Sequence, residues 1–301
     1  MNPFPTIYLL PPTLIDRVAP LFAAQTYDQP FRDAVFEGTL NAPVVVDDPI
    51  APTAVMLCHP FYFFLAGPVV PALRAFLKDA PEESGIFAHY YACATDSPDW
   101  RDALMADHNN FMTLDRRDFK WPAGQPALEW RSRLPHGATL ARIDGALAER
   151  VDRELNEHIS ANWGDYATFD VFGDGQALLL DGQITCAAYT CGASRRQANV
   201  GIVTAEAYRG RGLATLTCSA LIDRLTARGL QPTWCCDTIN TASGRLAEKL
   251  GFVEDTPYLQ VGPHWGQRLA LTRGGWVAGA PTDEGVAVWR RRAEPGDTIS
   301  D

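Results

Sequence analysis

The chain has 301 residues, a net charge of −10 and a pI near 5.1, with 47% hydrophobic and 21% charged residues. This composition supports a large apolar core and excludes a mainly disordered or collagen-like chain. The acidic balance argues against a general binder of nucleic-acid phosphates, because such proteins need clustered Lys and Arg. Residues 1–130 carry most of the excess negative charge, with 16 acidic and 8 basic side chains, against 20 and 18 in residues 131–301.

The first residues and the cysteines bear on the cellular compartment. The start, MNPFPTIYLLPPTLIDR, lacks the basic and then apolar segments of a signal peptide, and no apolar run approaches the roughly 20 residues of a membrane helix. The seven cysteines have no zinc-type pairing, and the six histidines have no metal-ligand spacing. We therefore expect a cytoplasmic protein with reduced thiols and no metal, which binds neither nucleic acid nor membrane.

The first 130 residues predict an α/β domain. Short apolar runs indicate strands, and two stretches with helical periodicity lie between them. Strands are expected at residues 44–46, 54–58, 61–66, 86–91 and within 107–121, and helices at 70–78 and 98–106. The Pro, Gly and His cluster at residues 134–137 then favours a domain boundary near residue 130.

The second half begins with a strand at residues 138–143 and an amphipathic helix. Leu147, Val151, Leu155 and Ile159 recur every four residues, as one face of a helix requires. Asp181-Gly182 separates two apolar runs, at residues 177–180 and 184–189, and this dipeptide is typical of a two-residue hairpin turn.

A β-branched run at residues 200–204 leads into a glycine-containing loop and then a long helix. This helix is expected to continue to residue 225 and to close at Gly229. A strand at residues 231–237, a helix at 242–250 and a strand or hairpin at 253–261 follow. We place a second domain at residues 131–262 and a C-terminal extension, with a strand-like segment at 286–289, at residues 263–301.

The loop Arg209-Gly210-Arg211-Gly212-Leu213-Ala214 has the chemistry of an anion site. Glycines let the main chain approach a ligand, and the first amides of the following helix are unpaired donors at the positive end of its dipole. The loop therefore predicts phosphate binding. It is not a Walker loop, because no Gly-Lys-Ser/Thr follows, and it lacks the third glycine of a dinucleotide fingerprint.

The loop resembles the pyrophosphate-binding turn of the GNAT superfamily of N-acetyltransferases, with Arg209, Gly212 and Ala214 at its three defining positions. Residues 240–252, which end in Leu250-Gly251-Phe252, resemble the late helix of that superfamily. The resemblance implies an α+β, sandwich-like fold with a mixed, centrally splayed sheet flanked by helices. A narrower likeness, which includes the N-terminal strings at residues 35–38, 45–48 and 64–67, is to the two-part group that contains zwittermicin-resistance acetyltransferases. The first domain would then be a diverged, non-catalytic unit of the same kind.

The resemblance implies that acetyl-CoA is the cosubstrate and that an amine attacks its thioester directly in a ternary complex. Main-chain groups on the strand would pair with the pantetheine arm, the loop amides and arginines would hold the pyrophosphate, and Asn240 would bond the pantetheine. The residues expected to bind coenzyme A are Ile202, Val203, Thr204, Arg209, Gly210, Arg211, Gly212, Leu213, Ala214, Thr215, Asn240 and Ser243.

Proton transfer is the open part of the mechanism. The family's usual Glu before the loop is replaced by Ala198-Asn199, and its usual Tyr, seven residues after the Asn, is Ala247. The substitute bases are Glu206 and Asp237, and the substitute acids are Ser243, Tyr258 and Cys236. A solvent chain could equally move the proton, or the domain could bind acyl-CoA without catalysis.

Trp163, Asp165 and Tyr166 lie in the segment that overhangs the acceptor site in the family, so they are candidates for acceptor contacts, with ordinary packing as the alternative. The acceptor is expected to be the amine of a small molecule, for example an antibiotic or an amino-acid-like metabolite. The negative charge of the first domain would favour a cationic one. An acetyltransferase that modifies proteins, and a module that senses acyl-CoA, are the alternatives.

Overall fold

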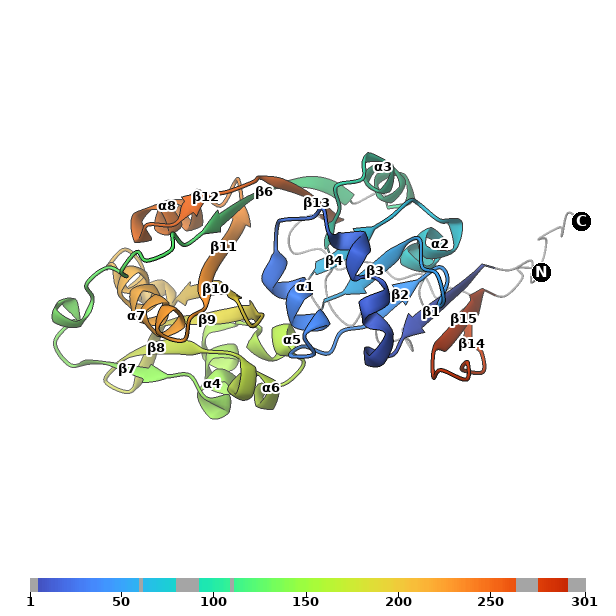
Figure 1. The fold of residues 1–301 in the computed structure, drawn as a ribbon. Helices are drawn as coiled ribbons and strands as arrows, with labels where there is room; N and C mark the ends of the chain where they lie inside the picture. Colours follow the sequence, from blue (N-terminus) through green and yellow to red (C-terminus); the bar gives the residue numbers. More distant parts are fainter. Residues whose placement is uncertain (1–4, 60–61, 80–91, 109–110, 264–275, 292–301) are drawn as a thin grey trace, which may run out of the picture. The chain divides into compact units, whose positions relative to one another are not determined.

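The computed structural model describes residues 5–59, 62–79, 92–108, 111–263 and 276–291 (Figure 1). The chain forms two compact units, each described separately below. Unit 1 consists of Met1–Gln25, Asn41–Leu114 and Leu259–Asp301, and unit 2 of Thr26–Leu40 and Asp115–Tyr258. The division is therefore not sequential. The boundary expected near residue 130 falls inside unit 2, and the segment expected as a separate C-terminal extension belongs to unit 1.

Unit 1 is built on a mixed sheet with the strand order β14-β15-β1-β2-β3-β4-β5-β13. Only β4 and β5 pair in parallel; the other neighbours within this order for which a register is defined are antiparallel. The elements are β1 (Thr6–Leu10), η1 (Pro12–Arg17), η2 (Ala19–Phe22), β2 (Val44–Val46), β3 (Val55–Cys58), β4 (Tyr62–Ala66), α2 (Pro71–Asp79), β5 (Ala92–Ala94), α3 (Pro98–Asp107), β13 (Tyr258–Pro263), β14 (Trp276–Ala278) and β15 (Ala287–Arg291).

The core of unit 1 is apolar. Leu73, Phe76 and Leu77 of α2 pack with Phe63 of β4, and Trp100 of α3 belongs to the same buried cluster. Each of these side chains is almost fully removed from water, which is the main stabilising contribution to a domain of this size. β15 pairs with β1, so the last described strand completes the sheet that the first strand begins.

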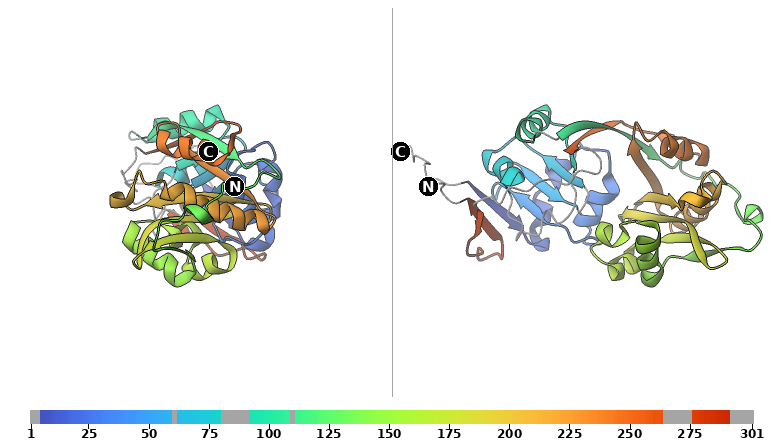
Figure 2. Two further views of the ribbon diagram at one scale, coloured as in Figure 1. Left: turned by 90° about the vertical axis from the view of Figure 1, so that its left-hand side faces the viewer. Right: turned by 180° about the vertical axis from the view of Figure 1, so that it is seen from behind.

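Unit 2 carries the sheet order β7-β8-β9-β10-β11, and β11 continues antiparallel along β6. Figure 2 shows the same elements from two further sides. The elements are α1 (Gln29–Phe36), β6 (Phe111–Lys120), η4 (Arg131–Arg133), β7 (Ala138–Arg142), α4 (Gly145–Leu155), α5 (Ile159–Trp163), α6 (Tyr166–Phe172), β8 (Gly175–Leu180), β9 (Gln183–Ala193), β10 (Gln197–Thr204), η5 (Glu206–Tyr208), α7 (Leu213–Ala227), β11 (Gln231–Asp237), α8 (Thr241–Leu250) and β12 (Val253–Glu254).

The centre of this sheet is splayed. β10 and β11 are parallel, but they pair only from Gln197–Asn199 to residues 231–233. A bulge at Asn199/Val200 interrupts the pairing of β10 with β9, and β10 then continues along β9 while β11 continues along β6. Because β9 has one extra residue here, Cys191, the bulge lies on β9, and the two parallel strands diverge where their own pairing ends after Asn199. The splay expected from the resemblance is therefore present.

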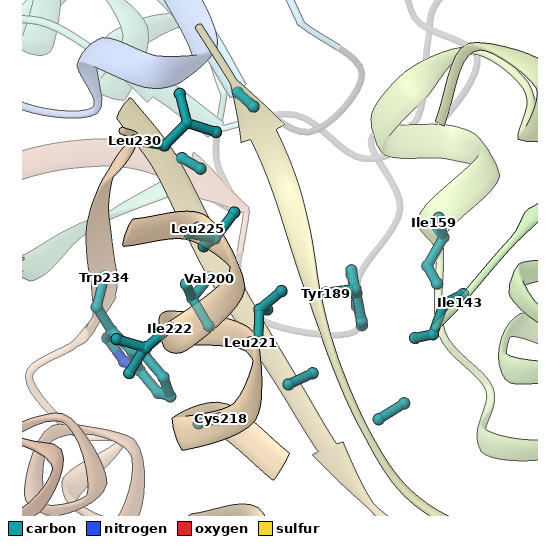
Figure 3. Close-up of a cluster of buried hydrophobic side chains, with 14 of the residues drawn as sticks. Ile143, Ile159, Tyr189, Val200, Cys218, Leu221, Ile222, Leu225, Leu230 and Trp234 are labelled. Carbon is teal, nitrogen blue, oxygen red and sulfur yellow. The ribbon is translucent and has the colours of Figure 1, made fainter. Parts of the chain in front are cut away.

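The core of unit 2 forms where α7 packs against β8, β9 and β10. Leu221 and Leu225 of α7 belong to the same buried cluster as Val200 of β10, and Ile222 and Trp234 belong to it too (Figure 3). Because most residues of α7 are buried, the helix has a fixed position on the sheet, and the direction of its N-terminus is fixed with it.

Most elements of unit 2 agree with the sequence prediction. The hairpin turn is as expected, with Asp181 and Gly182 at φ of 50° and 79°. The prediction of one helix running through Ile159 is wrong, however, because α4 ends at Leu155 and Ile159 begins α5. Asn156 adopts a left-handed conformation that ends the first helix. The four-residue spacing continues across the break because both short helices bury one face.

Some elements have no counterpart in the sequence prediction. Neither β1 nor α1 was expected, and α1 packs on β9 and β10, which lie far along the chain. The strand expected at residues 86–91 lies outside the described residues. All seven cysteines are free thiols. Among the described residues, no helix is long and apolar enough to cross a membrane.

Candidate active site

A cleft of about 670 Å³ lies in unit 2 between the end of β10, the loop before α7 and the start of α8, the helix that follows β11. All but two of the residues predicted to bind coenzyme A line it, the exceptions being Arg211 and Thr215. The lining comes from β10, the loop before α7, the first turns of α7 and α8, and one residue after α4: Glu157, Ile202, Val203, Thr204, Tyr208, Arg209, Gly210, Gly212, Leu213, Ala214, Asn240, Ala242, Ser243 and Leu246.

The loop before α7 presents main-chain donors to the cleft. Gly210 and Gly212 have φ of 74° and 78°, which residues with a Cβ adopt only at a cost, and no atom lies within 4 Å of where a Cβ would be. In the part of the chain that the structure describes, the amides of residues 210–214 donate to no other protein group. Thr215 differs, because its amide donates to the Gly212 carbonyl at 3.1 Å and its side chain is buried. The open amides at the helix N-terminus suit a polyanionic ligand.

Two arginines of the same loop are held by main-chain carbonyls. Arg209 donates through Nε to the Thr204 oxygen at 3.2 Å, and Arg211 donates through Nη2 to the Ala207 oxygen at 3.0 Å. The guanidinium of Arg211 also lies 5.1 Å from the centre of the Tyr208 ring. Both side chains are exposed, so their remaining donors can reach a phosphate at the rim of the cleft.

The opposite wall of the cleft is the start of α8. Asn240 caps this helix, because its side-chain oxygen accepts from the Ser243 amide at 3.2 Å. The Ser243 hydroxyl accepts from the indole nitrogen of Trp234 at 3.0 Å. Of the five residues proposed for proton transfer, only Ser243 lines the cleft that the structure describes; the others are Glu206, Asp237, Tyr258 and Cys236.

Two of these other candidates are buried in polar contacts. Asp237 is paired with Arg116, and the Tyr258 hydroxyl donates to Asp28. Burial raises the pKa of Tyr258 well above its usual value. Both side chains therefore have structural partners, and their catalytic roles stay predictions.

The remaining candidates also lie outside the cleft lining. Cys236 is buried on β11, and burial raises the pKa of its thiol. Glu206 is exposed on η5. Neither lines the cleft in the described part of the chain, so their roles in proton transfer stay predictions as well.

The three candidates for acceptor contacts support the fold around α5 and α6. Trp163 is 2% exposed, and its indole donates to the Thr190 carbonyl at 2.7 Å. Asp165 caps α6 by accepting from the Thr168 amide at 2.6 Å, and the Tyr166 hydroxyl donates to Asp152 at 3.1 Å. None of the three lines the cleft that the structure describes. Their contact with an acceptor stays a prediction.

Glu157 was not predicted from the sequence. This residue lies in the short turn between α4 and α5, lines the cleft, and accepts a hydrogen bond from the Tyr189 hydroxyl. Burial raises the pKa of Glu157, while the Tyr189 hydrogen bond lowers it. The residue was overlooked because the expected continuous helix placed it on a solvated face. The polar run Asn156-Glu157-His158, which breaks an otherwise periodic segment, was the available signal.

The polar groups of the cleft are of few kinds. They are the main-chain donors of the loop, exposed Arg209, the hydroxyls of Thr204 and Tyr208, the amide and hydroxyl side chains of the α8 start, and the carboxyl group of Glu157. Among the described residues, no group of three His, Cys, Asp or Glu side chains comes together in a way that could hold a metal ion. The cleft thus combines donors for an anion with one acidic group.

Comparisons with known proteins agree with this geometry. The profile of the GNAT acetyltransferase family matches residues 19–260. An uncharacterized N-acetyltransferase of Bacillus subtilis, YdfB, is 31% identical over 125 residues, which are 42% of this chain and 48% of that protein. The chain thus spans about half the length of this curated relative.

Solved structures show the same fold. A GCN5-related N-acetyltransferase-like protein from Streptococcus suis is 24% identical, with a TM-score of 0.68 over 84% of this chain and 99% of its own. A tandem GNAT protein from the clavulanic acid biosynthesis pathway is 12% identical, with a TM-score of 0.55 over 85% of this chain and 98% of its own. With the family profile covering most of its length and a glycine loop and splayed strands of the matching kind, the chain belongs to the GNAT acetyltransferase family.

Proposed function

We propose that the chain is an acetyl-CoA-dependent N-acetyltransferase that acetylates the amine of a small molecule. The observation that carries this proposal is the coincidence, in one cleft, of the edge of β10 that β11 leaves unpaired with the open amides of residues 210–214. Family membership implies an acyl-CoA cosubstrate. The cleft has room for an extended ligand along β10 and donors for a diphosphate at one end.

In this proposal, main-chain groups make most of the contacts with coenzyme A. The amides of residues 210–214, together with Arg209 and Arg211, hold the pyrophosphate, where the helix dipole of α7 adds to the attraction. The edge of β10 that β11 leaves unpaired, at residues 202–204, bonds the pantetheine arm as a further strand would. Asn240 contributes from the facing helix.

The reaction proceeds by direct attack of the amine on the thioester. An amide near Ile202 polarises the thioester carbonyl, because a fixed donor stabilises the negative charge that develops on the oxygen. Holding both substrates in one cleft supplies the orientation that a bimolecular reaction in water lacks. Ser243, at the facing wall, is a candidate to protonate the departing sulfur.

The narrower assignment to the group of zwittermicin-resistance acetyltransferases remains a prediction. It rests on the strings at residues 208–214 and 246–252 together with short strings in the first 67 residues. The acceptor of this chain, an antibiotic or an amino-acid-like metabolite, is a prediction of the same kind.

Transfer of a labelled acetyl group tests the proposal. Purified protein is incubated with carbon-14-labelled acetyl-CoA and a panel of amines, which includes the amino acids, polyamines and amino sugars, and both thiol release and labelled product are measured. We expect amine-dependent thiol release that matches product formation. Binding of coenzyme A by calorimetry without transfer to any amine would contradict catalysis and favour a sensing module.

A further inference from the structure

The carboxyl group of Glu157 lies at the cleft in a position that the known motifs of the sequence do not mark. It is half-buried, lines the same cleft as Ile202 and Val203, and accepts from the Tyr189 hydroxyl. Tyr189 faces Gly201 across the β9–β10 pair, and Gly201 directly precedes Ile202. Glu157 is therefore tied to the stretch of β10 at which the proposed function places the thioester.

The turn that carries Glu157 is rigidly held. Asn156 has φ of 56° and ψ of 48°, and the Glu157 amide donates to the Asp152 carbonyl at 3.2 Å. The Asp152 carboxylate accepts from the amides of Ile159 and Ser160 at 2.7 and 3.0 Å, which fixes the start of α5 on the other side of the turn. A side chain on such a turn keeps its direction, as a reacting group requires.

Gly201 leaves room for this arrangement. A Cβ at Gly201 would lie 2.5 Å from the Cys191 sulfur and 3.3 Å from the Tyr189 ring, so a larger residue there would displace the sulfur and crowd the tyrosine. The ring can lie against the β10 main chain, with its hydroxyl on the carboxyl group, because residue 201 has no side chain. The position of Glu157 thus depends on residues from the α4–α5 turn, β9 and β10.

Glu157 has an acidic neighbour in Asp152. Burial raises its pKa, the Tyr189 hydroxyl lowers it and Asp152 raises it, and the nearby thiol of Cys191 has a pKa raised by burial to about 12. Within the described part of the chain Glu157 forms no ion pair, whereas the buried carboxylate of Asp174 is bonded by two arginines. A half-buried carboxyl group without a cation, at the wall of a cleft, is suited to a cationic ligand.

We infer that Glu157 binds the ammonium group of the acceptor and removes its proton, with Tyr189 as the residue that positions the carboxylate. This inference rests on the proposed function and defines its substrate as a cationic amine. The usual base of the family, before the loop, is replaced here by Ala198-Asn199, whereas Glu157 is connected to β10 through Tyr189 of the paired strand β9.

The proton and electron balance is complete with these groups. The carboxylate of Glu157 takes one proton from the ammonium, and the neutral amine attacks the thioester carbonyl. A C–N bond forms, the C–S bond breaks with its electron pair on sulfur, and the second proton of the nitrogen passes to that sulfur. Glu157 then returns its proton to solvent, so the net products are the amide, the thiol and one proton.

The substitution Glu157→Gln tests the inference, with Glu149→Gln as the matched control. Glu149 is an exposed residue of α4 that loses the same charge outside the cleft. With an amine that the wild-type protein acetylates, we expect Glu157→Gln to lower kcat at least about 100-fold and to leave the dissociation constant of coenzyme A within about twofold, while Glu149→Gln changes neither.

The pH dependence of kcat distinguishes proton removal from a merely structural effect. The wild-type rate is expected to rise with pH through the ionisation of Glu157, and this rise should vanish in Glu157→Gln. Tyr189→Phe should shift that apparent pKa upward, because the hydroxyl lowers the pKa of the carboxyl group, and Glu157→Asp should restore part of the rate.

The outcomes separate the two proposals. A rate and pH profile of Glu157→Gln equal to those of the wild-type protein would overturn the role of Glu157 alone, and the same experiment on Glu206→Gln would then identify the rival base. A wild-type protein that binds coenzyme A but acetylates no amine would overturn the proposed function and this inference with it.

Discussion

The turn from strand to helix differs between the two units, although the elements around it follow in the same order. In unit 1, β4 leads into α2 and then to β5, which pairs with β4 in parallel; in unit 2, β10 leads into α7 and then to β11, which pairs with β10 in parallel. In unit 1 the connection is Gly67-Pro68-Val69-Val70, with Pro71 opening the helix. In unit 2 it contains Arg209-Gly210-Arg211-Gly212.

The space around one glycine in each turn differs between the two units. Gly67 has φ of 81°, and a Cβ there would lie 2.0 Å from the Thr53 oxygen, so this glycine allows close packing of the protein on itself. Gly212 has nearly the same φ but open space around it. Proline at positions 68 and 71 also removes two amide donors from the turn of unit 1. The same succession of elements therefore makes a packed turn in one unit and a turn with open donors in the other.

The largest expected effect on coenzyme binding separates these two turns. Gly212→Glu places a carboxylate among the donors of the loop, and we expect it to weaken coenzyme A binding at least about 100-fold, which corresponds to roughly 2.7 kcal/mol. Gly124→Glu is the control, since Gly124 has φ of 76° and equally open space but does not line the cleft. Equal affinity of both variants, measured by calorimetry, would contradict the assignment of the loop.

Substitution of the two turn glycines by alanine compares the turns through the free energy of unfolding. Gly67→Ala combines a left-handed conformation with a clash against Thr53, and we expect it to lower the free energy of unfolding by about 3 kcal/mol. Gly212→Ala should cost only about 1 kcal/mol, because its Cβ meets open space. Urea unfolding of both variants measures the difference. The reverse order would show that the loop of unit 2 is the packed one.

Loss of positive charge at the rim of the cleft is expected to have a smaller effect on coenzyme A affinity. The double substitution Arg209→Gln and Arg211→Gln is expected to weaken coenzyme A binding about tenfold, or about 1.4 kcal/mol, because both side chains are exposed and screened. Arg74→Gln in α2 is the control, since Arg74 bonds Asp107 in unit 1 at 2.7 Å. The difference in coenzyme A affinity between the double variant and the Arg74→Gln control should shrink as salt is added. A gap that does not depend on salt would argue against a charge contribution.

A further expected effect, on the pH dependence of stability, concerns a buried carboxyl group of unit 2. Burial, and then the charge of Asp28, raise the pKa of Asp118 on β6 to about 8, while Lys120 acts in the opposite direction. The folded state therefore keeps a proton that the unfolded state releases, so the free energy of unfolding should fall as pH rises from about 4 to 8. Asp118→Asn should flatten this fall, as urea unfolding at several pH values would show. An unchanged slope would indicate that other groups cause it.

Local signals in the sequence predicted the fold of unit 2 well. The Asp181-Gly182 turn, the glycine loop before α7 and the strand before it depend on conformational preferences of a few neighbouring residues, which a sequence displays directly. The pairing of β15 with β1 and the packing of α1 on β9 and β10 join segments far apart in the chain. Such contacts leave no periodic pattern, so they could not be predicted from the sequence.

The candidate site also has one part that local sequence signals predict and one part that depends on segments far apart in the chain. Its proposed coenzyme-binding residues belong to one strand, one loop and two helix starts, and the motifs that name them are contiguous. Glu157 and its partner Tyr189 are 32 residues apart, and they meet only because Asn156 ends α4 and turns the chain. The four-residue spacing of Leu147 and Val151 continues through that break and so conceals it. The sequence therefore predicted a site for the coenzyme, but not the group proposed to receive the acceptor.

A crystal structure with coenzyme A bound tests the central claim most directly. We predict one coenzyme per chain, lying between β10 and β11 of unit 2, with its diphosphate on the amides of residues 210–214 and its sulfur on the side of the cleft that Glu157 lines. A coenzyme bound in unit 1, or one whose diphosphate contacts none of these amides, would contradict it.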